Sequence, residues 1–299
     1  MLCLEDIPVF DAFYEKYPPV HSDYVFSTMM SWMEYSKYHY AFLGENLVIL
    51  TKIHDRVRFR LHPGAKNKDV VQQVLRLAYE QGSDEPFGVV DTLLKSWMQS
   101  LYPGLQFLKH RDFFDYVYRA DDLAELQGTA YRKIRNRLNK FQKNHRYRLE
   151  LISEDILDEV QTFLKRWCLW KDCESDEILS HEKNAILYSM NHFVDLGLSG
   201  LVLRINDEIE ALSVYEQMNA DTVIVHYEKG SPYFDGIYKA INMETAKQVQ
   251  HDVTYINREE DMGIAGLRKA KMSYRPHHMV EVFHLDKKNI GKVLYEQEE

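Results

Sequence analysis

The chain has 299 residues, of which 45% are hydrophobic, 13% aromatic and 28% charged. This composition supplies a globular core and excludes a disordered or fibrous protein. At about 150 residues per domain, the length predicts two domains. The formal net charge of −9 argues against a generally basic nucleic-acid-binding protein.

The charge is distributed unevenly along the chain. Residues 131–148 hold 8 Lys and Arg and no acid. Residues 1–130 hold 13 Lys and Arg against 18 Asp and Glu, and residues 149–299 hold 16 against 28. One short basic segment therefore lies within an acidic protein, and the net charge of the whole chain conceals it.

Cysteine content and the N-terminus indicate the compartment. Cys3, Cys168 and Cys173 are too few for a disulfide framework, so we expect a reducing compartment. They lack a second Cys or His pair at ligand spacing, so no metal site is predicted. The N-terminus has acids where a signal peptide begins with basic residues, and no apolar run reaches the ~20 residues of a membrane span. We therefore expect a cytoplasmic protein without a transmembrane segment, and peripheral contact with a membrane stays open.

The first half predicts a hairpin followed by a helix, a strand, a helix and a strand. Extended runs at 40–43, 47–51 and 57–61 are separated by turn residues at 44–46 and 54–56. Apolar residues then recur at helical spacing over 70–78. A strand at 88–90, a helix at 92–101 and a strand at 113–118 follow.

The second half repeats this order with longer elements. It predicts helices at 131–144, 156–170 and 182–196, strands at 200–205, 210–217 and 222–227, a helix at 235–248 and a strand at 254–256. Another helix begins near Asp261 and ends before Pro276, and the last strand covers 280–283. Two similar successions of elements predict an α+β fold with internal duplication. We place the boundary near residues 121–128, which gives segments 1–124 and 125–299.

The basic segment reads YRKIRNRLNKFQKNHRYR. On a helix, Ile134, Leu138 and Phe141 share one face. The remaining surface carries polar and basic candidates for contact with an anion: Arg132, Lys133, Arg135, Asn136, Arg137, Lys140 and Lys143. Either acids of the folded protein neutralise this helix, or it contacts phosphates of RNA or of an anionic lipid. The absence of any acid over 18 residues favours the external partner slightly.

A second candidate segment is His226-Tyr227-Glu228-Lys229-Gly230, at the end of a predicted strand. A loop between a strand and the start of a helix suits an anion or a substrate. Glu228 or His226 suits the role of a base, and Lys229 suits contact with a carboxylate or phosphate. The alternative is a charge pair between Glu228 and Lys229 at the strand end, which the residue types alone favour.

The third segment, from Tyr255 to Pro276, has the densest charge. Glu259, Glu260 and Asp261 suit an ammonium group. Arg258, Arg268 and Lys271 suit a carboxylate or phosphate. Tyr274 suits the donation of a proton to a leaving group, and Asn257 and Arg275 complete the predicted substrate-binding set. A capped and charge-paired helix explains the same residues equally well.

The strings EKGSPYFDGIYKAINMETAK and YINREEDMGIAGLRKAKMSYRPHHMVE, with YRKIRNRLNKF before them, resemble a known bacterial family. Its members are uncharacterised proteins grouped with the C-terminal domain of phosphatidylglycerol lysyltransferase. The resemblance is densest from Tyr131 to Glu281. It implies two units in tandem that are like N-acetyltransferases (GNAT, the acyl-CoA N-acyltransferase-like fold), with mixed central sheets. Segment 125–299 would carry the candidate site.

The resemblance also implies an activity, since the related Fem-type enzymes and lipid aminoacylators transfer an amino acid from aminoacyl-tRNA to an amine or hydroxyl. Aminoacyl-tRNA would then be the donor, and a lipid or a cell-wall precursor the acceptor. Glu228 or Glu259 would act as base and Tyr274 as acid, while the basic helix at 131–148 would contact tRNA.

Acetyl-CoA is the donor of ordinary GNAT enzymes, and a turn of the pattern Q/R-x-x-G-x-G/A holds it. The corresponding stretch here reads EKGSPYFDG. It lacks that pattern, and Pro232 removes a backbone donor, so acetyl-CoA is disfavoured. The alternatives are an acyl-CoA-dependent N-acyltransferase acting on a small amine, and a non-catalytic binding protein.

Overall fold

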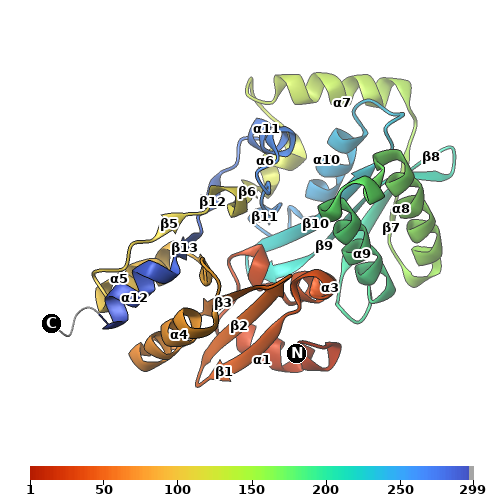
Figure 1. Cartoon of the computed structure of the whole chain (residues 1–299). Helices are drawn as coiled ribbons and strands as arrows, with labels where there is room; N and C mark the ends of the chain where they lie inside the picture. The colour runs from red at the N-terminus through yellow and green to blue at the C-terminus, as the bar shows by residue number, and fades with distance from the viewer. Residues whose placement is uncertain (296–299) are drawn as a thin grey trace. The chain divides into compact units, whose positions relative to one another are not determined.

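The computed structural model describes residues 1–295 and divides the chain into two compact units (Figure 1). The first unit comprises Met1–Asp115, Glu260–Ile264 and the described chain from Val280 onward. The second comprises Tyr116–Glu259 and Ala265–Met279. These units differ from the segments 1–124 and 125–299, because the last strand and helix of the chain return to the first unit.

The first unit contains a six-stranded sheet with the order β1-β2-β3-β4-β13-β5 (Figure 1). Its strands are β1 (His39–Leu43), β2 (Asn46–Ile53), β3 (Arg56–His62), β4 (Phe87–Val90), β5 (Leu108–Lys109) and β13 (Phe283–Leu285). Its helices are α1 (Ile7–Tyr14), α2 (Phe26–Ser31), α3 (Met33–Ser36), α4 (Lys68–Gln81), α5 (Thr92–Leu101) and α12 (Lys287–Tyr295). The predicted hairpin and the helices near 70–78 and 92–101 are confirmed.

Helix α4 shows how the sequence specifies one of these elements. Asn67 caps its first turn by accepting hydrogen bonds from the backbone N–H groups of Asp69 and Val70. Val71 and Val74 lie one turn apart and are fully buried in the core of the first unit. The periodicity of the sequence therefore marks the buried face of the helix correctly.

The second unit contains a seven-stranded sheet with the order β12-β6-β11-β10-β9-β8-β7. Its strands are β6 (Asp115–Arg119), β7 (Arg148–Leu151), β8 (Ser199–Ile205), β9 (Glu208–Asn219), β10 (Thr222–Gly230), β11 (Tyr255–Asn257) and β12 (His278–Val280). Its helices are α6 (Ala120–Glu125), α7 (Arg132–Asn144), α8 (Leu157–Lys171), α9 (Glu177–Asn191), α10 (Ile237–Val249) and α11 (Ala265–Ser273). Both sheets mix parallel and antiparallel pairs, so the predicted α+β fold is confirmed.

Three predicted elements of the second half differ from the structure. The helix expected at 182–196 lies at 177–191, because Asp176 caps it by accepting a hydrogen bond from the N–H of Leu179. The helix expected from Asp261 begins only at Ala265, because Met262 and Gly263 have positive φ angles. The single strand expected at 280–283 is two strands, β12 and β13, which belong to different sheets.

One hydrophobic core of the second unit packs α6, α7 and α10 against the sheet. Ile134, Leu138 and Phe141 of α7 are buried in it, as their spacing predicts. Gly236, which caps α10, is packed so closely against α7 that an added Cβ would lie 3.0 Å from the carbonyl oxygen of Arg137. The basic helix is therefore fixed directly beside the first turn of α10.

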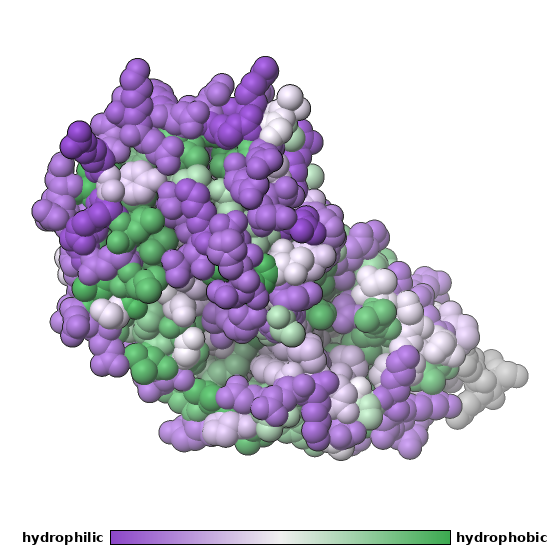
Figure 2. All heavy atoms as spheres, turned by 180° about the vertical axis from the view of Figure 1, so that it is seen from behind, coloured by the Kyte–Doolittle hydropathy of each residue, from purple (hydrophilic) through white to green (hydrophobic). Residues whose placement is uncertain are grey.

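Within residues 1–295, no helix combines the length and the apolar character that crossing a bilayer requires. Figure 2 shows mainly hydrophilic side chains on the visible face, with hydrophobic ones in small groups.

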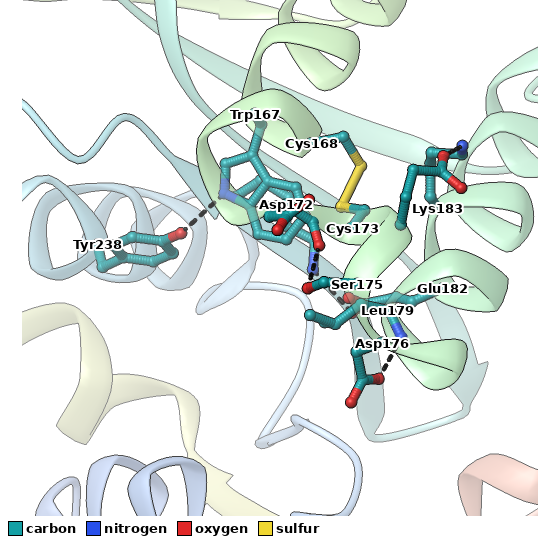
Figure 3. The surroundings of a disulfide bond; sticks show 12 residues. Trp167, Cys168, Asp172, Cys173, Ser175, Asp176, Leu179, Glu182, Lys183 and Tyr238 are labelled. Atoms are coloured by element: carbon teal, nitrogen blue, oxygen red, sulfur yellow. Dashed lines mark hydrogen bonds and ion pairs between the residues drawn. A yellow bond between two sulfur atoms is a disulfide. The ribbon is translucent and has the colours of Figure 1, made fainter.

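Cys168 and Cys173 form a disulfide in the structure (Figure 3), although three cysteines had suggested reduced thiols. Asp172 has a positive φ and ends α8, and this turn brings the two Cα atoms to 5.2 Å, a separation that suits a disulfide. Figure 3 also shows the neighbouring Trp167 directed toward Tyr238 of α10, to whose hydroxyl its indole N–H donates a hydrogen bond of 3.2 Å. The disulfide thus joins the end of α8 to the turn before α9, while the neighbouring Trp167 contacts α10.

Candidate functional site

The candidate site lies where strands β10 and β11 diverge. Their parallel pairing covers only Thr222–Ile224 and Tyr255–Asn257. Strand β10 continues to Gly230, paired with β9 alone, while the chain leaves β11 through Arg258 and Glu259. The side chains of the second and third candidate segments meet in this divergence.

Glu228 and Arg258 form an ion pair across the divergence. Both side chains are largely buried, with exposed fractions of 9% and 14%. The amide nitrogen of Asn242 on α10 donates a hydrogen bond of 2.9 Å to the other carboxylate oxygen of Glu228. The Nη1 atom of Arg258 and the Oδ1 atom of Asn242 are buried without a hydrogen-bond partner among the described residues. Buried polar atoms of this kind are uncommon and suit contact with a bound molecule.

Two aromatic rings and a lysine complete what we call the β10–β11 site. The guanidinium carbon of Arg258 lies 5.1 Å from the ring centre of Tyr274 and 5.7 Å from that of Tyr118. Lys239 Nζ lies 4.7 Å from the ring centre of Tyr274. Burial raises the pKa of the Tyr274 phenol, so the hydroxyl keeps its proton at neutral pH. The site is defined by Tyr118, Glu228, Lys239, Asn242, Arg258 and Tyr274.

His226 lies between two carboxylates. Its Nδ1 is 2.9 Å from Glu259 and its Nε2 is 2.8 Å from Glu216 on β9. Burial alone would lower the pKa of His226, but the hydrogen bonds and charges of the two glutamates raise it to about 10. His226 is therefore an imidazolium at neutral pH and is unsuited to the role of a base. It lies at an irregularity of the ladder between Val225 and Tyr227.

The backbone after β11 is held in a strained conformation by several side chains. Glu259 has a φ of 56°, in the left-handed region that a residue with a Cβ rarely adopts. Lys271 is buried and donates hydrogen bonds to the carbonyl oxygens of Arg258 and Glu259, at 2.6 and 3.1 Å. Asn257 accepts a hydrogen bond from the backbone N–H of Glu259. Lys271 and Asn257 thus hold the backbone of Arg258 and Glu259, and this backbone positions the side chains of these two residues.

The remaining candidates of these two segments lie outside the β10–β11 site. Lys229 pairs with Glu182 at 2.7 Å and lies 4.3 Å from the ring centre of Trp167, which excludes the alternative of a Glu228–Lys229 pair. Because successive residues of a strand point to opposite faces, the adjacent side chains of Glu228 and Lys229 on β10 meet different partners.

Glu260 and Asp261 belong to the first unit. Asp261 is fully buried and forms a salt bridge with Arg111 at 3.1 Å. In the second unit, Arg268 is half-buried on α11, and the exposed Arg275 follows that helix with a positive φ.

The basic helix α7 is only partly neutralised by the protein itself. Asp235 pairs with both Arg137 and Lys140, at 3.3 and 3.6 Å. Arg135 donates hydrogen bonds to the carbonyl oxygens of Leu126 and Gly128. The remaining exposed cations of α7, Arg132, Lys133 and Lys143, form no ion pair with any residue of 1–295, and neither does Arg146 after the helix. Arg148, the last cation of the segment, pairs with Glu150 and Asp207.

Sequence reasoning missed Glu216, Tyr118, Lys239 and Asn242. Lys239 and Asn242 lie three residues apart in a helix that the sequence predicts, so their shared face was available as a signal. The sequence did not indicate that this face is directed toward Glu228. Glu216 lies on the neighbouring strand of a predicted meander, where only the register reveals its partner.

The second unit also has a surface hollow outside the β10–β11 site. A surface hollow of about 230 Å³ shares no residue with the β10–β11 site and is lined by Leu149, Glu150, Leu151, Leu201, Glu244, Lys247 and Gln248. Among residues 1–295, no group of three or more His, Cys, Asp or Glu side chains is placed to hold a metal ion.

The sequence of the chain is similar to that of one known family and of one uncharacterised protein. The chain matches the family model "Phosphatidylglycerol lysyltransferase, C-terminal" over residues 14–285. An uncharacterised protein of Mycoplasmoides gallisepticum is 22% identical over 188 residues, or 62% of this chain. The match spans only 59% of that relative's length.

Solved structures give matches over nearly the whole chain. A conserved protein of unknown function from Bacteroides thetaiotaomicron has 29% identity and a TM-score of 0.87, over 95% of this chain and 98% of its own. L-PGS from Bacillus licheniformis has 14% identity and a TM-score of 0.63, over 94% and 92%. FemX has 10% identity and a TM-score of 0.55, over 98% of each chain. A tandem GNAT protein from the clavulanic acid pathway has 9% identity and a TM-score of 0.50, over 96% and 97%.

These last similarities show a shared fold of tandem GNAT-like units. The family model covers most of the chain, and the chain therefore belongs to the family of the phosphatidylglycerol lysyltransferase C-terminal domain.

Proposed function

We propose that the protein transfers an aminoacyl group from aminoacyl-tRNA to an amine or hydroxyl of a lipid or cell-wall precursor. The observation that carries this proposal is the contact between α7 and the start of α10 at Gly236. Gly236 precedes Lys239 of the β10–β11 site by three residues in the sequence. Its contact therefore fixes α7, a helix with unpaired exposed cations, beside the turn of α10 that carries Lys239. A polyanionic donor bound along α7 would therefore have its reactive end near buried polar groups.

The β10–β11 site suits the chemistry of acyl transfer. The acceptor would attack the ester carbonyl carbon, and the ribose oxygen of the donor would leave. The guanidinium of Arg258, which has one unpartnered Nη atom, suits the oxygen that gains negative charge in this step. The protonated hydroxyl of Tyr274 suits the donation of a proton to the leaving oxygen.

The setting of α10 favours this donor over acetyl-CoA. In the structure Pro232, which has no backbone N–H, and Gly236 precede the helix. Gly236 is packed against α7, so this turn differs from the turn that holds acetyl-CoA in ordinary GNAT enzymes. The proposal places the protein in the cytoplasm, where aminoacyl-tRNA is formed, with access to an anionic membrane surface from that side.

Salt-dependent tRNA binding tests the proposal. We expect the triple variant Arg132→Ala, Lys133→Ala, Lys143→Ala to bind total tRNA more weakly. Each lost phosphate contact lowers the slope of log K against log salt by about 0.9, or about 2.7 for all three. At 0.1 M salt this corresponds to a loss of up to about 500-fold in affinity.

A matched control removes the same charge elsewhere. Lys66, Lys68 and Arg76 are exposed in the first unit, so their replacement by Ala should leave the slope unchanged. Equal losses in both triple variants would show only an effect of net charge. Absence of salt-sensitive tRNA binding by the wild type would refute the proposal. Stabilisation by acyl-CoA thioesters instead would favour a CoA-dependent enzyme.

A further inference from the structure

The carboxylates near the reacting centre are already engaged. Glu228 accepts hydrogen bonds from Arg258 and Asn242, and Glu259 is bound to the imidazolium of His226. Both carboxylates are therefore occupied by a cationic side chain of the protein itself. Acyl transfer to an amine or hydroxyl nevertheless requires a group that takes the acceptor's proton.

Lys239 is the remaining basic group of the β10–β11 site. It lies in the first turn of α10, whose N-terminal end disfavours a positive charge. Four groups face it from four elements: Arg137 of α7, Glu228 of β10, Arg258 after β11 and the ring of Tyr274 after α11. Burial, followed by the charge of Arg258, lowers the pKa of Lys239 to about 8, against the opposing effect of Glu228.

We propose that Lys239 is the catalytic base that takes the proton from the acceptor, an inference that rests on the proposed function. A base works best when its pKa is close to the working pH. At pH 7.5 a lysine with a pKa of 8 is neutral in roughly one molecule of four, whereas an ordinary lysine is neutral in about one of a thousand. The surroundings of Lys239 thus make an amine available that an exposed lysine would not provide.

The proposed step balances in protons and electrons. The lone pair of the acceptor nitrogen or oxygen forms a bond to the ester carbonyl carbon, and the acceptor's proton passes to Lys239 Nζ. The tetrahedral intermediate then breaks its bond to the ribose oxygen, which leaves with the proton of the Tyr274 hydroxyl. The Lys239 ammonium returns a proton to the tyrosinate, and both residues regain their starting states.

The pH dependence of transfer tests this role in the full chain. The substrates are total tRNA charged with labelled amino acids and vesicles that contain phosphatidylglycerol, and the readout is enzyme-dependent loss of the aminoacyl ester. We expect kcat/KM of the wild type to rise with pH and to level off above an apparent pKa near 8. Lys239→Met and Lys239→Arg should both lose about 100-fold or more and should both lack this rise.

The arginine variant separates catalysis from a merely electrostatic role. It keeps the positive charge and the length but cannot be deprotonated at these pH values. Retention of more than half of the activity by Lys239→Arg, or an unchanged pH profile in Lys239→Met, would overturn the inference while tRNA binding by the wild type still supported the proposed function. Lys247→Met, at the exposed far end of the same helix, is the control and should keep the wild-type profile. If wild-type protein neither binds tRNA nor releases the aminoacyl group, both proposals fail.

Discussion

Replacement of His226 by Gln should remove a specific part of the pH dependence of stability. In the unfolded chain a histidine has a pKa near 6.5, whereas in the folded protein the two glutamates raise the pKa of His226 to about 10. The difference of about 3.5 pKa units corresponds to stabilisation on the order of 5 kcal/mol. Because the folded-state pKa is raised, this stabilisation is fully present below pH 6.5 and is lost as the pH rises through 10.

The variant should therefore be several kcal/mol less stable than the wild type at pH 7. Between pH 7 and pH 9 the difference should shrink by about 1.4 kcal/mol per pH unit. Urea unfolding at pH 7, 8 and 9, followed by the fluorescence of the 4 Trp residues, measures this difference. His251→Gln removes an exposed histidine and should follow the wild type at every pH. A constant difference between wild type and His226→Gln over this range would refute the assignment of His226 as an imidazolium held by Glu216 and Glu259.

Two further substitutions, Gly236→Ala and Lys271→Met, test the supports of the site, and Gly266→Ala is the control for the first. Gly236→Ala should destabilise the protein by roughly 1–3 kcal/mol in urea unfolding, because its φ is 102° and an added Cβ would meet Phe141 at 2.9 Å. Gly266→Ala, where an added Cβ meets nothing within 4 Å, should be neutral or slightly stabilising. Lys271→Met should cost about 1–3 kcal/mol, since two backbone carbonyls lose their buried donor. It should also lower ester release more than tRNA binding, because Arg258 loses its fixed position.

The order of elements was accessible from the sequence because local periodicity encodes it. Helix α5 begins and ends where the pattern predicts, at Thr92 and Leu101. Boundaries that depend on tertiary contacts were not accessible. Asp261 looks like a helix cap in the sequence, yet it is buried against Arg111 within the first unit, and α11 starts four residues later in the second. Residues 280–283 look like one strand, but the chain changes sheets there.

The candidate site was predictable as a set of segments and not as a set of contacts. Glu228, Arg258 and Tyr274 were each singled out by residue type, and the divergence of β10 and β11 brings them together. Local reasoning favoured a pair between Glu228 and Lys229, which the alternation of side chains along β10 prevents. Lys239 shares a predicted helix face with Asn242, but its lowered pKa was not predictable, because it arises from burial and from Arg258, 19 residues away in the sequence.

From composition alone, the basic segment could be neutralised by acids of the protein or by an external anion. Its own protein neutralises one part of α7, through Asp235 on Arg137 and Lys140, and leaves another part without acidic partners. Asp235 belongs to the loop that leads into α10, so the neutralised part is also the part that contacts this loop. Arg132 and Lys143 lie at opposite ends of the helix, roughly 16 Å apart along its axis. That distance exceeds a Debye length of about 8 Å at physiological salt, so a single small anion would not engage both ends. A rigid polyanion lying along the helix would, which supports the proposed contact of α7 with tRNA over a contact with a free phosphate.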